Sequence, residues 1–98
     1  MGIRFLDVAQ TELDEAIEYY NSKSPGLGDA FLVETLKALE RIRHFPKAWH
    51  SFSDNTRRCQ LNRFPYALTY QLLEKEILIA AVAHLHREPG YWKDRIHE

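Results

Sequence analysis

Residues 63–95 read RFPYALTYQLLEKEILIAAVAHLHREPGYWKDR, and this stretch decides the fold. Between 66 and 73 every second residue is large and apolar, which predicts a strand with one buried face. Residues 77–84 are apolar on both faces, as in a strand at the centre of a sheet. Glu74-Lys75-Glu76 is short enough to be a hairpin turn between them. The stretch therefore predicts an antiparallel pair of strands, with its polar and charged side chains gathered at the strand ends.

The chain just before this pair supplies another strand. Residues 57–63 alternate between apolar and polar side chains and predict a strand. Pro65 separates it from the next strand, because proline cannot donate to a ladder. Residues 47–55 predict a loop, in which two aromatic side chains can act as anchors, Trp49 and Phe52.

The N-terminal half predicts a short strand over 3–7 and then two helices. Thr11 offers an N-cap for the first helix, which ends near Lys23 where turn residues follow. A wide apolar stripe predicts the second helix over 27–44, and Pro46 stops it. The order is β-α-α-β-β-β. The predicted fold class is α+β: a two-helix antiparallel hairpin on a four-stranded, mainly antiparallel sheet, in a single domain over residues 1–98.

Composition limits what the protein can do. The chain has 98 residues, a net charge of −1 and one cysteine, Cys59. A single cysteine cannot form an intramolecular disulfide, which favours a cytoplasmic location. Its place on a strand predicts a buried, inert thiol. The apolar run at 77–83 is too short to span a bilayer, so no membrane partner is expected. Residues 57–95 carry seven basic and four acidic side chains. This excess permits an acidic partner, but a dedicated duplex-DNA binder is usually more basic.

Arginines form the first candidate site. Their planar fork binds phosphate or carboxylate with two hydrogen bonds, and strand ends can bring several of them to one surface. The candidates for contact with a target are Arg57, Arg58, Arg63, Arg87 and Arg95. The alternative is that they are solvated or paired with neighbours such as Glu88 and Asp94.

His84 and His86 form the second candidate site, because alternate residues of a strand share a face. Two imidazoles can begin a metal site, but no third ligand stands at a recognisable spacing, so no metal is expected. Histidine also titrates near neutrality and can serve as a general base. The favoured alternative is structural, with His84 a buried, hydrogen-bonded strand residue and His86 a rim residue.

Aromatic side chains form the third candidate site, since their faces can stack on bases. Tyr66 and Tyr70 share a strand face with leucines, so core packing is the favoured interpretation. Tyr91 and Trp92 can equally pin the tail onto the sheet. The sequence contains no glycine-rich phosphate loop, no Ser-His-Asp arrangement and no paired-carboxylate motif.

Two sets of residues agree with one known pattern. The C-terminal set is Arg63-Phe64-Pro65-Tyr66, Tyr70, His84, Arg87, Pro89, Tyr91-Trp92 and Arg95. The helical set is Ala16, Ile17, Tyr19-Tyr20, Ser24-Pro25, Phe31, Leu39 and Pro46. Together they resemble the RelE/ParE superfamily of type II toxin–antitoxin toxins, which includes plasmid stabilisation proteins. The resemblance implies two helices on an antiparallel sheet and a cognate antitoxin that neutralises the toxin in a hetero-oligomer.

The superfamily divides by target. RelE-like members cut mRNA at the ribosome without a metal, whereas ParE-like members inhibit DNA gyrase. Arg58 and Arg87 match the nuclease set, and Tyr91 or Lys93 falls near its C-terminal tyrosine. Gln60 and Ala67 stand where that set has a lysine and an arginine, which weakens the nuclease interpretation.

The sequence therefore predicts a ParE-like toxin that arrests growth by binding a macromolecular target, with gyrase favoured, and that needs no cofactor. The expected target-binding residues are Arg57, Arg58, Arg63, His86, Arg87 and Arg95. One alternative is a RelE-like mRNA endonuclease, whose catalytic candidates are Arg58, His84, Arg87 and Tyr91. The other is an inactive relic that binds only its antitoxin.

Overall fold

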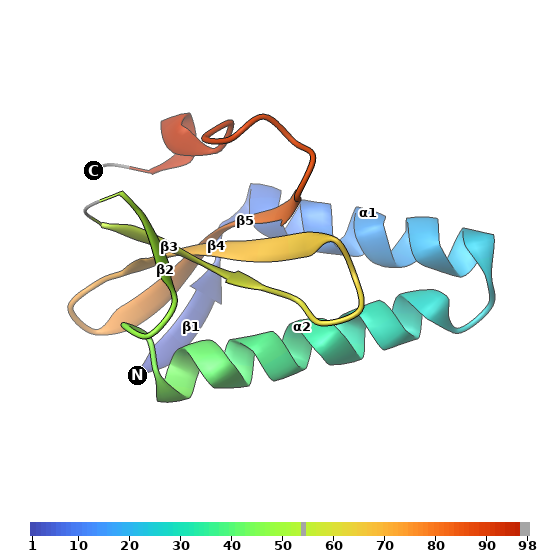
Figure 1. Cartoon of the computed structure of the whole chain (residues 1–98), viewed down its shortest axis with the longest axis horizontal. Coiled ribbons are helices and arrows are strands. Elements are labelled where there is room, and N and C mark those ends of the chain that lie inside the picture. The colour runs from blue at the N-terminus through green and yellow to red at the C-terminus, as the bar shows by residue number, and fades with distance from the viewer. Residues whose placement is uncertain (54, 97–98) are drawn as a thin grey trace.

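A computed structural model describes residues 1–53 and 55–96 of the chain. Its elements are β1 (Gly2–Phe5), α1 (Asp7–Lys23), α2 (Leu27–His44), β2 (His50–Ser53), β3 (Thr56–Gln60), β4 (Tyr66–Leu72), β5 (Glu76–His84) and a 3-10 turn, η1 (Lys93–Arg95). The two helices run side by side along the sheet, and the chain after β5 turns back across it on the side away from α2 (Figure 1). The α+β class and the helical hairpin are confirmed.

The sheet has five strands in the order β1-β5-β4-β3-β2. β1 pairs with β5 in parallel, and the other pairs are antiparallel. The predicted hairpin of β4 and β5 is present, and β5 lies between β1 and β4. The mainly antiparallel sheet is thus confirmed.

The predicted number of four strands is wrong, because β2 forms inside the segment that was expected to be a loop. It is an edge strand of four residues, HSFS, paired with β3 from His50 opposite Arg58. Its register is interrupted between Ser51 and Ser53. Such a short, exposed and irregular strand has no apolar alternation by which a sequence pattern could identify it.

α1 begins at Asp7, before the predicted cap at Thr11. The amide of Leu6 still donates to the carbonyl of Ile79 (3.0 Å), so the chain passes from strand pairing directly into the helix. The predicted end at Lys23 and both predicted ends of α2 are confirmed. Between the helices, Gly26 is the N-cap of α2 with a φ of 87°, a left-handed conformation that favours glycine.

The core lies between the helices and one face of the sheet. Tyr70, Phe31, Leu68 and Ile79 are fully buried there, and the Tyr70 hydroxyl donates to the carbonyl of Pro46. Tyr66 packs its ring 4.9 Å from that of Phe31. The core role predicted for Tyr66 and Tyr70 is confirmed. Cys59 is 1% exposed, and burial raises the pKa of its thiol, as expected for an inert side chain.

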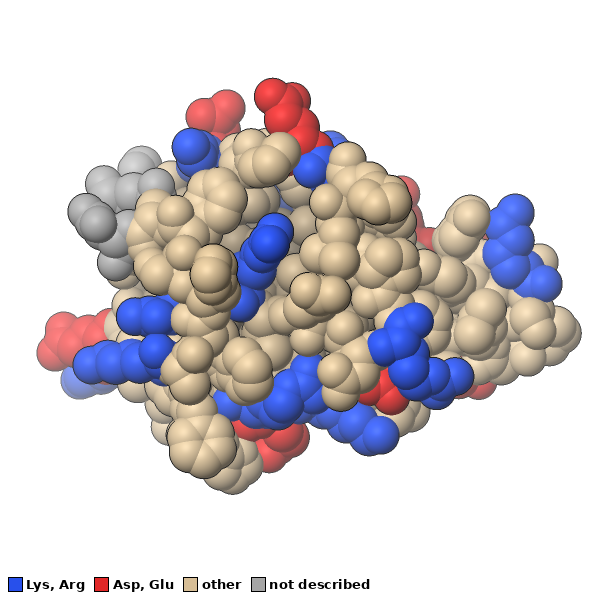
Figure 2. Space-filling view, in the orientation of Figure 1, with Lys and Arg blue, Asp and Glu red and all other residues tan. Residues whose placement is uncertain are grey.

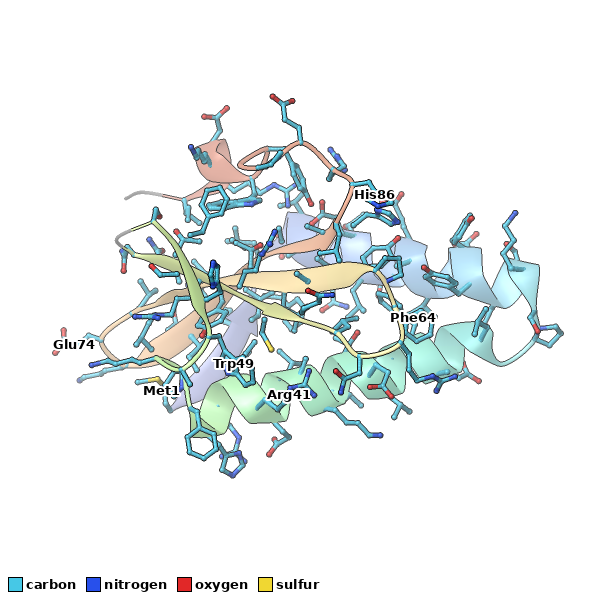
Figure 3. The ribbon with its side chains drawn as sticks, in the orientation of Figure 1. Met1, Arg41, Trp49, Phe64, Glu74 and His86 are labelled. Carbon is cyan, nitrogen blue, oxygen red and sulfur yellow. The ribbon has the colours of Figure 1, made fainter. Side chains whose placement is uncertain are left out.

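The two predicted loop aromatics and the C-terminal tryptophan act as anchors. The Trp49 indole donates to the carbonyl of Arg41 on α2 (3.3 Å), and the two side chains lie together beneath β2 in Figure 3. Phe52 of β2 meets Trp92 edge to face at 5.1 Å, and Trp92 is 4% exposed. The Trp49 contact fastens the chain before β2 to α2, and the Phe52–Trp92 contact holds the C-terminal segment against β2.

Candidate functional site

An open groove of about 500 Å³ runs between α1 and the end of β5. Its lining combines exposed aromatic and aliphatic side chains with both signs of charge. The lining residues include Val8, Glu12, Tyr19, His84, Arg87 and Arg95. Val8 and Tyr19 are 41% and 53% exposed, so the groove offers apolar surface to a partner.

Glu12 of α1 joins three parts of the chain at the floor of this groove. Its carboxylate accepts hydrogen bonds from the backbone amide of Val82 (3.1 Å), the Tyr91 hydroxyl (2.8 Å) and both terminal nitrogens of Arg95 (2.8 and 3.1 Å). The side chains of Glu12 and Arg95 are only 15% and 18% exposed. This geometry is the bidentate pairing that arginine makes with carboxylates.

The network also completes the edge of β5. The register of β1 with β5 ends at Phe5 opposite Ile79, while β5 continues to His84. Beyond that point the Val82 amide donates to Glu12, and Nη1 of Arg95 donates to the carbonyl of Ala80 (3.1 Å). Two side chains therefore replace a strand along part of this edge, which satisfies backbone groups that would otherwise be open to pairing.

Two guanidinium groups lie close to the ring of Tyr91. Cζ of Arg87 is 3.9 Å and Cζ of Arg95 is 5.0 Å from the centre of its ring. Burial, together with the hydrogen bond and negative charge of Glu12, raises the pKa of Tyr91 well above its usual range. The hydrogen bond to Glu12 likewise raises the pKa of Arg95. Tyr91 therefore stays a neutral donor at physiological pH.

The two predicted histidines are neighbours at the end of β5. Their ring centres are 4.9 Å apart, and the backbone amide of His86 donates to Nδ1 of His84 (3.1 Å). The His84 ring also meets that of Tyr66 at 5.1 Å. His86 is exposed where the chain leaves β5 (Figure 3). His84 is thus a hydrogen-bonded strand residue and His86 a rim residue, as predicted, but His84 is half-buried and not buried as expected.

A second, smaller hollow of about 40 Å³ lies on the sheet face that the C-terminal segment crosses. All four residues predicted as nuclease candidates line it: Arg58, His84, Arg87 and Tyr91. Gln60 and Ala67 are direct cross-strand partners in the register of β3 and β4, and Ala67 lines the same hollow. The two positions that lack the expected cations therefore lie opposite each other on this face of the sheet.

The other predicted target contacts lie apart from the hollow. Arg57 is half-buried, and its Nη1 donates to the carbonyls of Lys47 (3.0 Å) and Trp49 (2.9 Å). Arg63 is exposed in the turn before β4 with a φ of 71°, and Arg95 is held by Glu12. Figure 2 shows basic side chains at separate places on the viewed face. Arg57 and Arg95 thus hold backbone and tail in place, while Arg58, Arg63, His86 and Arg87 are exposed.

Sequence reasoning did not identify Glu12 as a functional residue. The signal was its position between Ala9 and Leu13, both of which are buried on α1. A carboxylate inside an apolar stripe needs a partner, because an unpaired buried charge is costly. The partner comes from 83 residues further along the chain, which no local pattern can reveal.

Neither described helix is long and apolar enough to cross a membrane. Over residues 1–53 and 55–96, the side chains of His, Cys, Asp and Glu form no cluster of three that could hold a metal ion.

One family of known proteins matches most of the chain. The model of the family described as the ParE toxin of the type II toxin–antitoxin system, parDE, matches residues 3–89. No curated protein sequence matches it. Among solved structures, a chain of the chromosomal ParDE TA system from P. aeruginosa has a similar fold, with a TM-score of 0.70 and 17% identity over 88% of this chain and 97% of that one. The chain belongs to the ParE toxin family of type II toxin–antitoxin systems.

Proposed function

We propose that this chain is a ParE-like toxin that arrests growth by binding a macromolecular target, with DNA gyrase as the target, and that a cognate antitoxin neutralises it. It acts in the cytoplasm as a non-enzymatic inhibitor and needs no cofactor. The observation that carries the choice over RNA cleavage is the pairing of Gln60 with Ala67.

The charges available at the hollow favour binding over RNA cleavage. Metal-free cleavage of a phosphodiester needs proton transfer together with stabilisation of the charge that develops on the phosphate. The resemblance to RelE-like nucleases places cations at positions 60 and 67, but here an uncharged amide faces a methyl group. Arg58 and Arg87 alone offer an anion-binding pair without the full set, which suits binding better than bond cleavage.

The groove along α1 is the proposed contact for the antitoxin. It combines exposed apolar side chains with Arg87 at its rim, and the part of β5 beyond β1 borders it. An amphipathic helix with carboxylates can lie in such a groove. A helix in this groove covers Arg87, which also lines the second hollow, and this shared residue links antitoxin binding to loss of target binding.

The test is expression of the lone chain and of the chain together with the product of the neighbouring small open reading frame. We expect the lone chain to stop growth and the pair to grow normally and to purify as a complex. A harmless lone chain that binds no neighbouring product contradicts the proposal. A harmless chain that still binds that product supports the inactive relic instead.

A RelE-like mRNA endonuclease remains the second candidate, because Arg58, His84, Arg87 and Tyr91 line one hollow. In that mechanism Arg58 and Arg87 stabilise the phosphate, and the histidine supplies proton transfer. Mapping of transcript 5′ ends after induction separates the two. Codon-periodic cleavage supports the endonuclease, and intact transcripts support the inhibitor.

A further inference from the structure

α2 has two faces that differ in burial. One face packs into the core through side chains that are fully buried, Phe31, Thr35, Ala38 and Ile42. The opposite face turns large apolar side chains outward, with exposures of 52% for Leu36, 48% for Val33 and 36% for Leu32. A helix face with three exposed aliphatic residues in two turns is typical of a surface that another protein covers.

Two of the charged residues on this outward face lie in line with Leu36, while Lys37 and Glu40 lie beside it. Asp29 lies in the first turn of α2 and Arg43 in the last, and each is seven residues from Leu36. Seven residues are close to two helical turns, so the three side chains lie on one line with about 10.5 Å between neighbours. From the start to the end of α2, this line therefore carries an acidic, an apolar and a basic side chain.

This order is complementary to itself under a two-fold axis through Leu36. When two copies of the helix pack antiparallel, each Asp29 comes opposite Arg43 of the second copy, and the two Leu36 side chains meet at the axis. A parallel arrangement instead places like charges opposite each other at both ends. An isologous, antiparallel contact between two copies is the symmetry on which most homodimers are built.

We propose that the outward face of α2 is the interface of a homodimer, in which two copies of α2 pack antiparallel across Leu36. The surface around Leu36 is open, shallow and mainly apolar. It is formed by Val33, Leu36, Lys37, Glu40 and Arg41, so Leu36 of the second copy can pack against it.

The charged ends can form pairs between the copies without breaking those within each. Arg43 donates to Glu40 from Nε (3.3 Å) and Nη2 (2.8 Å). A guanidinium has five N–H donors, so Nη1 can reach Asp29 of the second copy. Arg43 then bridges two carboxylates, which strengthens each pair relative to an isolated surface ion pair.

The interface is small. α2 has 18 residues, which corresponds to about 27 Å of helix, and a single helix pair lies at the lower end of stable interface sizes. We therefore expect a weak dimer that dissociates on dilution and at high salt. None of its residues lines the groove along α1 or the hollow beside Arg58. The inference is thus independent of the proposed function, and a dimer presents two target surfaces at once.

Sedimentation equilibrium of the purified full chain over the micromolar range tests the inference. We expect a concentration-dependent dimer in the wild type. Leu36→Glu abolishes it, and the single reversals Asp29→Arg and Arg43→Asp each raise the dissociation constant about tenfold or more, because like charges then face each other twice. The double reversal Asp29→Arg with Arg43→Asp restores dimerisation with the opposite polarity.

Matched controls on α1 carry the same changes in charge. Glu18→Arg and Lys23→Asp are exposed and lie off the α2 face, so both keep the wild-type dissociation constant. Circular dichroism at low concentration verifies that each variant is folded. A chain that stays monomeric throughout the range overturns the inference, as does a folded double reversal that fails to dimerise. Loss of antitoxin binding by Leu36→Glu in a monomeric chain assigns this face to the antitoxin and also overturns it.

Discussion

Glu12 and Arg95 form an ion pair of 2.8 Å between the first helix and the last described turn of the chain. Each partner also binds the backbone of β5, Glu12 at the Val82 amide and Arg95 at the Ala80 carbonyl. The pair therefore closes the strand edge and fastens the tail at the same time. Arg95, which the sequence predicted as a target contact, therefore stabilises the structure of the site.

Replacing Glu12 by alanine is expected to lower the free energy of unfolding by about 2 kcal/mol. The change leaves the Val82 amide, the Tyr91 hydroxyl and a largely buried Arg95 without their acceptor. Chemical denaturation monitored by tryptophan fluorescence measures the effect. Glu18→Ala, on the exposed side of the same helix, should change stability by less than about 0.5 kcal/mol. Equal effects of the two substitutions would refute the role given to Glu12.

Stability should fall as the pH rises above about 10. Burial raises the pKa of Tyr70 to about 12, and burial with the Glu12 contact raises the pKa of Tyr91 further. The unfolded tyrosines lose their protons near pH 10, and the folded ones do so only at higher pH, so alkali favours unfolding. This contribution is fully present below pH 10. Denaturant midpoints between pH 8 and 11 measure the decline, which should be shallower in Tyr91→Phe. An unchanged slope in that variant would contradict the account.

Gly28→Ala should destabilise the helical hairpin by about 1–3 kcal/mol. A Cβ at this position would lie 2.1 Å from the carbonyl oxygen of Ile17, which forces the two helices apart. Gly2→Ala is the matched control, because its Cβ would meet no heavy atom within 4 Å. Thermal unfolding should show a lower midpoint for the first variant and a nearly unchanged one for the second. A neutral Gly28→Ala would show that the helices do not approach this closely.

Arg58→Ala together with Arg87→Ala should reduce toxicity about tenfold or more, if each arginine contributes roughly 1 kcal/mol to target binding. Both side chains are exposed and line the hollow across which the C-terminal segment runs, so the fold should be retained. Growth after graded induction measures the effect. Lys75→Ala, in the exposed turn before β5, provides the control. Undiminished toxicity of the double variant would show that these arginines do not carry the activity.

Much of the fold could be predicted because its strong patterns are local. The apolar run that became β5 and the stripe that became α2 each contain a periodicity that specifies one element. β2 could not be predicted in this way, since its four residues lack an alternation of buried apolar and exposed polar side chains. It is a strand because it pairs with β3. The start of α1 was also missed, because Leu6 is placed by its bond to Ile79 in a strand far along the chain.

In the candidate site, too, local features could be predicted and contacts between distant parts of the chain could not. The positions of His84 and His86 on one strand end follow from the sequence alone. The different roles of Arg58, exposed over the hollow, and Arg95, paired with Glu12, depend on how the tail folds back. Gln60 and Ala67 are cross-strand partners because of the register between β3 and β4. Sequence reasoning identified both substitutions but could not know that they form a single uncharged area.

The most direct test of the central claim measures RNA and DNA damage in the same culture. After induction of the lone chain, transcript 5′ ends and chromosomal breaks are mapped in parallel, and purified gyrase is assayed for supercoiling with and without the chain. The account predicts transcripts that stay intact, breaks that depend on gyrase, and inhibited supercoiling. Codon-periodic mRNA cleavage with unaffected gyrase would contradict it.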